Sequence, residues 1–413
     1  MATVIKGGTI IDGTGNGPFA NADLVIDGAK ITAISSNGQN GSGAIPEDAT
    51  IIDATGKYVL PGLINAHTHL CWDCVGDLKE QSHFDPPVMV AFKYAMNLRH
   101  CLQAGVTTVR ELGSPYDIPL AATQAVNQGI IAGPRIFHSG RPLSITGGHA
   151  FWMGTHQVDG PDAVRKAVRE ELRNGASWIK MMASGSREEG LTNKGTVWTK
   201  AFPEFTLDEL RAAADEAHAA GKRITAHATE TRAIRNCVEA GFDAVEHGGP
   251  IEDDVLERMA ADEIWIVPTL SPANLQVERG AQIGMPAFEI ERRRQQIRTK
   301  AENTVRAARA GVPLAMGTDA GSPAVPNHEV VREIELMVEL GICETPMEAI
   351  MISTHNGAKL LGVDDQIGTL EPGKFADVIV VDRNPLENLA VLRDVHLVFL
   401  GGELVARDGI VLK

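Results

Sequence analysis

An apolar run that ends in two histidines places the strongest constraint on the fold of this chain. Residues 59–70 read Val-Leu-Pro-Gly-Leu-Ile-Asn-Ala-His-Thr-His-Leu, which predicts a buried strand ending near His67 and His69. Alternate side chains of a strand point to the same face, so the two imidazoles project side by side. Two adjacent imidazoles at the end of a strand form half of a metal site. Residues far along the chain must supply the rest.

The middle of the chain alternates between candidate strands and candidate helices. The strand candidates are 59–65, 106–111, 135–140, 178–183, 223–228, 243–247, 264–269 and 313–318. Helical patterns are clearest over 161–174, 206–220, 231–240 and 287–310, with Thr206 as a candidate N-cap. Eight strand–helix units are the number that a closed parallel (β/α)8 barrel needs, and such barrels carry their chemistry at the C-terminal ends of the strands. On the strand pattern alone, an open doubly wound α/β sheet is the rival.

Short strands without intervening helices are predicted at both ends of the chain. They lie at 3–12, 23–34 and 50–53, and again at 377–381, 395–400 and 403–406. Either set alone would leave unpaired strand edges and half a core. We therefore expect residues 1–58 and 365–413 to form one small β-sandwich, with the barrel spanning 59–364.

Four more residues of metal-ligand type stand at the ends of predicted strands. They are Lys180, His227, His247 and Asp319. A barrel gathers the C-terminal ends of its strands at one rim, so these side chains are expected to meet the histidine pair there. Lys180 alone is a weak indication, because a buried lysine is costly unless it is paired or neutralised.

Charge and cysteine content narrow the class of protein. A net charge of −15 disfavours a nucleic-acid-binding surface, which needs clustered lysine and arginine. No basic leader precedes an apolar stretch, and no apolar run approaches the roughly 18 residues of a membrane span. Five cysteines, an odd number, suit a reducing compartment, so a cytoplasmic location is expected. Cys71 and Cys74 are interpreted as ordinary thiols, because no second Cys-x-x-Cys pair completes a zinc knuckle.

With these residues in place, the chain resembles the amidohydrolase superfamily. The shared pattern is His-x-His followed by Lys, His, His and Asp on successive predicted barrel strands. The resemblance covers nearly the whole chain and includes the segments 61–64, 246–248, 317–320 and 368–377. It is greatest to the imidazolonepropionase-like and prolidase-like branch. That branch includes Xaa-Pro dipeptidases, carboxypeptidases that act on N-acyl amino acids, and hydrolases of aryl amides, ureas and carbamates.

The resemblance implies a site with two divalent metal ions, usually Zn²⁺. One ion would be held by His67, His69 and Asp319, the other by His227 and His247, with Lys180, carboxylated by carbon dioxide, as the bridging ligand. A hydroxide that bridges the two ions would attack the scissile carbonyl. Asp319 would take its proton and pass it to the leaving nitrogen, as a general base and then a general acid.

Substrate recognition is expected from the loops that follow the strands. The candidates are His149, Trp72, Phe151, Trp152, Arg187, Thr229 and His328. In the similar branch, a Thr-Gly-Gly-His sequence supplies a histidine to the substrate carbonyl, which makes His149 a catalytic candidate too. The aromatic residues suit either an apolar pocket or core packing, and the segment 185–205 suits either a lid or a plain surface loop.

One departure from the branch bears on the substrate. Peptidase-like relatives commonly carry a tyrosine two residues after the strand-five histidine, where it helps bind the substrate carboxylate. Thr229 occupies that position in this chain. The difference weakens the dipeptidase interpretation and favours a non-peptide amide, urea or carbamate.

The expected reaction is metal-dependent hydrolysis of a C–N bond in a small molecule. The preferred substrates are N-acyl amino acids or dipeptides with an apolar or aromatic residue. Aryl amides, ureas and carbamates, including man-made compounds, are the alternative. A non-catalytic binding protein on the same fold is a third hypothesis, but such relatives usually lose metal ligands and this chain retains the set. Barrels of this kind often form homo-oligomers, although no stretch of the sequence marks an interface.

Overall fold

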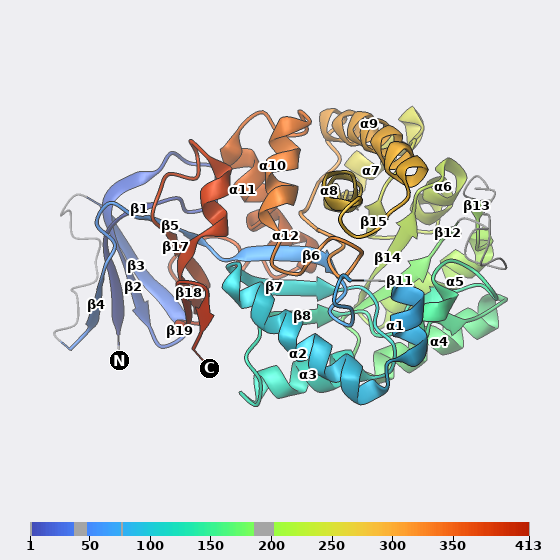
Figure 1. The fold of residues 1–413 in the computed structure, drawn as a ribbon, viewed down its shortest axis with the longest axis horizontal. Helices are drawn as coiled ribbons and strands as arrows, with labels where there is room; N and C mark the ends of the chain where they lie inside the picture. Colours follow the sequence, from blue (N-terminus) through green and yellow to red (C-terminus); the bar gives the residue numbers. More distant parts are fainter. Residues whose placement is uncertain (1, 37–47, 76, 186–201, 413) are drawn as a thin grey trace.

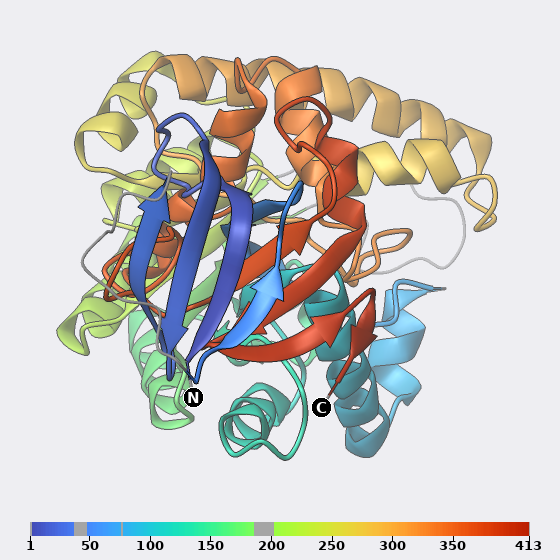
Figure 2. The same cartoon turned by 90° about the vertical axis from the view of Figure 1, so that its left-hand side faces the viewer.

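The two ends of the chain form one sheet (Figures 1 and 2). The computed structural model describes residues 2–36, 48–75, 77–185 and 202–412. The strand order is β20-β19-β18-β17-β5-β1-β2-β3, and β4 also pairs with β1. The strands are β1 (Thr3–Ile10), β2 (Phe19–Asp27), β3 (Lys30–Ser36), β4 (Thr50–Asp53), β5 (Tyr58–Pro61), β17 (Val378–Val381), β18 (Val395–Leu400), β19 (Glu403–Arg407) and β20 (Ile410–Val411).

Strand β5 joins the N-terminal and C-terminal strands of this sheet. It runs parallel to β1 on one side and antiparallel to β17 on the other. The two ends therefore share a small β structure, as expected from the sequence. It is a single nine-stranded sheet, where a sandwich of two sheets was expected. Residues 59–61, expected at the start of the barrel, belong to this sheet.

The sheet buries both of its faces at β17. Val378 and Val380 point into a core made by the terminal strands themselves. Ile379 and Val381 point the other way, into the core shared with the rest of the chain. The continuous apolar sequence of β17 follows from this double burial.

The remaining long strands are parallel and fall into two groups. One is β6-β7-β8 and the other is β10-β9-β11-β14-β15-β16. Their bounds are β6 (Leu63–Thr68), β7 (Val106–Glu111), β8 (Arg135–His138), β9 (Leu143–Ser144), β10 (His156–Gln157), β11 (Trp178–Met182), β14 (Arg223–Ala228), β15 (Ala244–His247) and β16 (Trp265–Val267). A short separate pair is made by β12 (Ser184–Gly185) and β13 (Phe202–Pro203). Seven of the eight strand candidates in the middle of the chain thus contain a strand.

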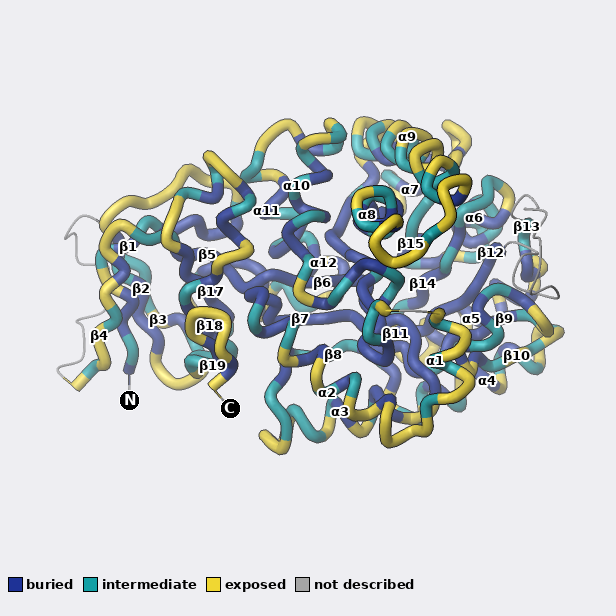
Figure 3. The backbone as a smooth tube through the Cα atoms, in the orientation of Figure 1, coloured by how far each residue is buried: buried dark blue, intermediate teal, exposed yellow. Residues whose placement is uncertain are grey.

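Helices cover the outside of these strands (Figure 1). They are α1 (Leu78–Phe84), α2 (Pro87–Gln103), α3 (Ile118–Asn127), α4 (Pro161–Arg173), α5 (Leu207–Ala219), α6 (Thr231–Glu239), α7 (Asp253–Ala261), α8 (Ser271–Arg279), α9 (Ala287–Arg309), α10 (Val331–Glu339), α11 (Pro346–Ile352) and α12 (His355–Leu361). Thr206 caps α5 in a capping box with Glu209, as its sequence predicts. Along helices such as α4, buried residues recur every three to four positions between exposed ones, so one face of the helix is buried and the other is exposed (Figure 3).

The eighth strand candidate, 313–318, is not a regular strand, but its backbone still links the two parallel groups. The Ile266 amide donates to the Pro313 carbonyl at 2.9 Å, and the Ala66 amide donates to the Met316 carbonyl at 2.8 Å. On the opposite side, the Ser177 amide donates to the His138 carbonyl of β8 at 2.9 Å. Proline at 313 has no amide to add to a ladder, which is one reason for the irregular backbone.

A glycine separates the terminal sheet from the first parallel strand. The continuous strand predicted over 59–65 is broken at Gly62 into β5 and β6. A Cβ atom at Gly62 would lie 2.2 Å from the Thr107 hydroxyl oxygen, so only glycine fits. Its amide donates to the Asp377 carbonyl at 2.9 Å, next to β17. The break turns the chain from the sheet into β6.

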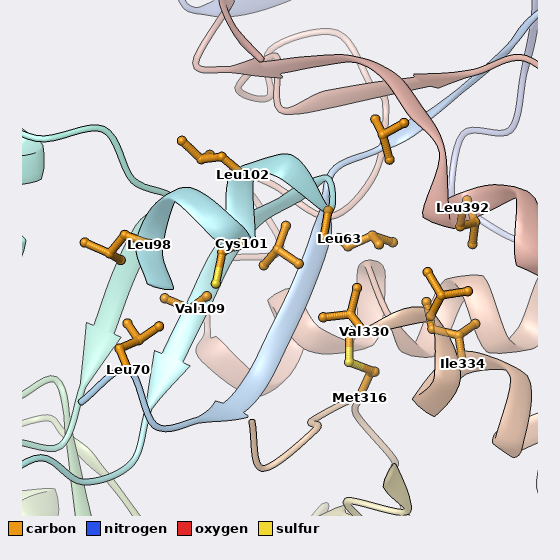
Figure 4. Close-up of a cluster of buried hydrophobic side chains, with 14 of the residues drawn as sticks. Leu63, Leu70, Leu98, Cys101, Leu102, Val109, Met316, Val330, Ile334 and Leu392 are labelled. Carbon is orange, nitrogen blue, oxygen red and sulfur yellow. The ribbon is translucent and has the colours of Figure 1, made fainter. Parts of the chain in front are cut away.

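A buried apolar cluster holds β6 in position (Figure 4). It brings Leu63 of β6 together with Val109 of β7, Leu102 of α2, Ile334 of α10 and Met316. These residues come from segments more than 200 positions apart, and their packing fixes the strand that ends in the two histidines. None of the helices in the described ranges combines the length and apolar character that crossing a lipid bilayer requires.

Candidate metal centre

The histidine pair meets Asp319 at the end of β6. The Nε2 atoms of His67 and His69 lie 3.5 and 3.2 Å from Oδ1 of Asp319. One ligand atom from each of the three residues lies within 4.8 Å of the others. Two imidazoles and a carboxylate at this spacing form a site that a divalent cation fits.

The backbone around Asp319 is built for this approach. Asp319 has a φ of +53°, and its amide donates to the His67 carbonyl at 2.8 Å. At Gly317, a Cβ atom would lie 2.7 Å from Cβ of His67 and 2.4 Å from Cγ1 of Val267. A left-handed aspartate costs free energy, and such positions gather at functional sites.

Two further histidines stand beside the pair. His227 is on β14 and His247 ends β15, and their ring centroids are 4.4 Å apart. The ring of His247 is 4.9 Å from that of His67. His247 also has a left-handed backbone, with a φ of +70°. The ends of β6, β14 and β15, together with the irregular segment before Asp319, thus bring four histidines and this aspartate to one place.

Lys180 of β11 lines the same cavity as these five side chains. It is only 1% exposed. Burial lowers the pKa of Lys180 to about 8, and the carboxylates of Glu246 and Asp319 oppose this shift. Its amine therefore loses its proton more readily than that of a surface lysine, and a larger fraction of it is neutral at physiological pH.

Burial favours the neutral form of His67, His227 and His247. Burial lowers the pKa of His67 to about 4, and it lowers the pKa values of His227 and His247 well below the ordinary value. The carboxyl group of Asp319 has its pKa lowered because His69 and His67 outweigh the effect of burial. Neutral imidazole and ionised carboxylate are the forms that bind metal. The donor set therefore fits a divalent cation.

A buried ion pair that we did not predict supports His67. Its Nδ1 lies 2.7 Å from Oε2 of Glu246, which is fully buried. The other carboxylate oxygen accepts from Arg110 and from Thr225, both at 2.6 Å. Arg110 also donates to the Ala66 carbonyl at 2.6 Å. This network fixes the ring of His67 and leaves its Nε2 to face the site.

Hydrogen bonds at Nδ1 orient the rings of His69 and His247 in a similar way. Nδ1 of His69 lies 2.9 Å from the Gly113 carbonyl oxygen, which fixes the tautomer with the proton on Nδ1. Nδ1 of His247 lies 2.7 Å from the Thr269 hydroxyl oxygen. Lys300 of α9 donates to that hydroxyl at 3.0 Å and to the Thr269 carbonyl at 2.7 Å. Lys300 is a second functional candidate that the sequence reasoning missed.

Comparison with known proteins identifies the family. The family model described as "Amidohydrolase family" matches residues 58–405. The chain belongs to the amidohydrolase family. It is similar to the ochratoxinase of Aspergillus niger, with 29% identity over 448 aligned residues that cover 99% of this chain and 87% of that protein. It is 27% identical to the imidazolonepropionase of Geobacillus kaustophilus over 398 residues, covering 88% and 84%.

Solved structures agree with this assignment. A crystal structure of a Xaa-Pro dipeptidase with methionine bound in its active site is 29% identical and has a TM-score of 0.85, covering 98% of this chain and 99% of that one. This amidohydrolase is therefore a hydrolase that acts on carbon–nitrogen bonds, in the imidazolonepropionase-like and prolidase-like branch. The family generally uses divalent metal ions, in agreement with the His/Asp cluster.

Two adjoining cavities open at the metal centre of the amidohydrolase. The tryptophan cavity, of about 260 Å³, is lined by Trp72 and Trp152 as well as by the metal-ligand candidates. The arginine cavity, of about 520 Å³, is lined by Arg292, Arg293 and Lys300 of α9. Both cavities share Asp319, His227, His247, Pro272 and Arg293. A substrate held at the centre can thus extend in two chemically different directions.

Four of the predicted substrate residues lie in these cavities. Trp72, Trp152 and His149 line the tryptophan cavity, and Thr229 lines the arginine cavity. The ring of His149 stacks on that of His227, with centroids 4.0 Å apart.

Of the other three predicted substrate residues, the two that the structure describes are not brought to the centre. Phe151, in the short helix η1 (Phe151–Met153), lines neither cavity. His328 is exposed and packs its ring against His100 at 5.5 Å. Arg187 and most of the segment 185–205 lie outside the described residues, so the lid hypothesis stays a prediction.

Proposed function

We propose that this amidohydrolase cleaves the amide bond of N-acyl amino acids or dipeptides with an apolar or aromatic residue. The observation that carries the proposal is the aromatic wall of the tryptophan cavity. The ring centroids of Trp72 and Trp152 are 5.7 Å apart, and Trp72 lies 5.0 Å from the ring of His69. An apolar or aromatic substituent placed there gains from burial and from ring contacts while its amide stands at the metal centre.

The arginine cavity supplies a partner for a substrate carboxylate. Arg292 and Arg293 both line this cavity, and both pair with the carboxylate of Glu289. Arg293 lines both cavities, so its guanidinium is within the reach of a substrate bound at the centre. In peptidase-like relatives a tyrosine contacts the substrate carboxylate, and in this chain Thr229 occupies its position. We assign that carboxylate contact to Arg293 instead.

Two divalent cations fit the donor set, and we propose Zn²⁺. His67, His69 and Asp319 would hold one ion and His227 and His247 the other, with carboxylated Lys180 between them. The lowered pKa of Lys180 supports this assignment, because only a neutral amine adds to carbon dioxide. Bound in this way, the ions polarise a carbonyl group and lower the pKa of water.

We assign the proton transfers to Asp319. Its carboxylate is ionised at neutral pH and lies at the wall that both cavities share. It takes a proton from the water that adds to the scissile carbonyl carbon, and it gives that proton to the leaving nitrogen as the C–N bond breaks. His149 would donate a hydrogen bond to the carbonyl oxygen. Glu204 accepts hydrogen bonds from the His149 amide at 2.8 and 2.9 Å and so holds this residue in place.

An assay of paired substrates tests the proposal. The zinc-loaded enzyme is given N-benzoyl-L-phenylalanine and the corresponding amide, which differ only in the carboxylate. We expect kcat/KM for the acid to be about 100-fold higher, which corresponds to roughly 2.7 kcal/mol of transition-state binding. Arg293→Met removes this preference, while Arg294→Met, at an exposed position paired with Glu291, leaves it unchanged. Equal rates for acid and amide refute the carboxylate assignment.

A second candidate function rests on Thr229. The smaller side chain leaves room in the arginine cavity and removes the tyrosine hydroxyl of the peptidase-like relatives. This observation favours aryl amides, ureas or carbamates that lack a carboxylate. Hydrolysis of phenylureas or aryl carbamates faster than N-acyl amino acids would select this function.

We also propose that the two parallel sheets and the segment 313–320 form a closed eight-stranded barrel. The hydrogen bonds that link this segment to β16 and β6, and Ser177 to β8, support closure. The barrel and the terminal sheet together divide the chain into the segments 1–58, 59–364 and 365–413. By strand pairing, the first boundary lies at Gly62, because β5 belongs to the terminal sheet.

A further inference from the structure

Helices α1 and α2 expose a continuous set of large apolar side chains. Phe84, Val88, Met89, Phe92 and Met96 are exposed by 75, 63, 45, 67 and 40%. We call these five residues the apolar face. Every other exposed residue between positions 84 and 96 is proline or alanine, and the two charged residues in this range, Asp85 and Lys93, are only partly exposed.

The spacing of these residues places them together. Val88, Phe92 and Met96 follow one another at intervals of four along α2, which makes one stripe on the helix. Phe84 ends α1, directly before the first turn of α2. Lys93 ties the two helices together by donating to Gln81 at 2.9 Å and to Asp85 at 2.7 Å. The charge of Lys93, which lies between Phe92 and Met96 in the sequence, is therefore already paired within the chain.

The area of this face is that of a protein interface. At on the order of 150–200 Å² for each side chain, the five exposed fractions amount to about 430–580 Å². The largest apolar patch on a typical monomer is about 300–600 Å². A standard interface buries about 800 Å² per partner, and about 65% of a homodimer interface is apolar, which is about 520 Å². The area of the apolar face is comparable with that requirement.

Charge distinguishes between a protein partner and a membrane. Cellular membrane surfaces are negative, and peripheral proteins bind them through unpaired lysine and arginine near the apolar residues. This chain has a net charge of −15, and the lysine beside the face is neutralised by Asp73 and Asp85. A second copy of the chain meets the face with the same uncharged stripe. Helix stripes at intervals of four pack against each other in the commonest class of helix crossing, and twofold dimers are the commonest symmetric oligomers.

We propose that the apolar face formed by Phe84, Val88, Met89, Phe92 and Met96 is the interface of a homodimer. The face continues toward β20, where Ile410 and Leu412 are also exposed and Arg99 of α2 donates to the Val411 carbonyl at 3.3 Å. The two copies bury α1 and α2 against each other across a twofold axis.

The dimer interface has a consequence for the substrate cavity. Leu78 of α1 lines the tryptophan cavity, and Ser82 of α1 accepts a hydrogen bond from the Trp72 indole at 3.0 Å. Contact between copies therefore restrains the short helix that holds one of the two tryptophans. Each active site is steadied by the neighbouring copy without receiving a residue from it.

Sedimentation velocity of the full chain between about 1 and 50 µM tests the interface. We expect the wild-type protein to sediment as a dimer, or as a multiple of one. Phe92→Glu weakens the association at least 100-fold, because it buries two carboxylates in the interface. Val88→Lys, which places the opposite charge on the same stripe, has the same effect. Circular dichroism and thermal unfolding of both variants check that the fold is retained.

Phe288→Glu is the matched control. Phe288 has the same side chain and nearly the same exposure, 66%, but it lies on α9, far from α2 (Figure 1). This variant keeps the wild-type association. A wild-type monomer at 50 µM overturns the proposal, and so does a Phe92→Glu variant that associates like the wild type. A wild-type monomer that floats with phosphatidylcholine vesicles would instead assign the face to a lipid surface.

Discussion

Replacement of Glu246 by glutamine tests the buried network behind His67. Glu246 is the only carboxylate that the structure shows bonded to both His67 and Arg110, and both Glu246 and Arg110 are fully buried. Burial raises the pKa of Glu246, but the guanidinium of Arg110 and the ring of His67 outweigh it and hold the pKa at about 2. Against an ordinary value of 4.5, this difference is worth about 3 kcal/mol of stability.

The sign of the pH dependence follows from the lowered pKa. The stabilisation by Glu246 is present above pH 4.5, and it is lost as the pH falls from there toward 2. At neutral pH, Glu246→Gln leaves the Arg110 charge buried without a counterion. We expect the free energy of unfolding to fall by about 3–5 kcal/mol. Urea unfolding followed by circular dichroism, on metal-free protein, measures this change.

The same substitution changes the metal site. The amide of glutamine can present its NH₂ group to Nδ1 of His67, which then accepts and moves the ring proton to Nε2. That tautomer cannot bind a cation through Nε2. We expect metal affinity to fall by about 10–100-fold, measured by elemental analysis after dialysis against graded zinc buffers.

A double variant separates charge pairing from packing. Arg110→Met combined with Glu246→Gln removes both charges, and it should recover most of the lost stability, with a coupling of at least about 2 kcal/mol. A Glu246→Gln variant within 1 kcal/mol of the wild type, or strictly additive single changes, would refute this account of the network.

Three further predictions concern separate features. Gly317→Ala should destabilise the protein by about 2–3 kcal/mol and displace His67, because the added Cβ would meet its Cβ at 2.7 Å; Gly17→Ala, with open space around the site, should change neither urea unfolding nor zinc content. Burial lowers the pKa of His138 from 6.5 to about 4, so the protein loses stability as the pH falls from 6.5 to 4. His138→Gln should reduce that loss by up to about 3 kcal/mol, and an unchanged pH profile of unfolding would contradict the assignment. Asp319→Asn should keep the fold and lose at least about 1,000-fold in kcat, and near-normal turnover would exclude Asp319 from proton transfer.

Much of the metal centre was predictable, because each ligand stands where an apolar strand ends. His67, His227 and His247 follow runs that only a buried strand explains, and parallel strands bring such ends together. The terminal strands were likewise predictable from their unpaired edges. The structure of the segment 313–318 was harder to predict. Its apolar residues suggest a strand, but Pro313 lacks an amide and Gly317 lies close to His67 and Val267, so the segment forms only isolated β-bridges.

The supporting residues were harder to predict, although one signal was present. Glu246 and Arg110 lie in apolar strands 136 residues apart, and the rule that a buried charge needs a partner applies to both. In the sequence analysis this rule was applied only to Lys180. Which charge pairs with which depends on the register of non-adjacent strands, and the sequence does not contain that information in local form. The cationic wall of α9 was missed because a charged helix usually faces solvent.

The pairing of β5 with β17 also determines when, during synthesis, the terminal sheet can be completed. The ribosome releases β1 to β5 more than three hundred residues before β17 appears. At typical rates of synthesis, this interval lasts about 15–60 s. During that time the open edge of β5 has no partner strand from its own chain, and it is free to recruit the same edge of another nascent copy. Pairing with β17, late in synthesis, closes this edge of β5 and with it the route to edge-to-edge association of nascent chains.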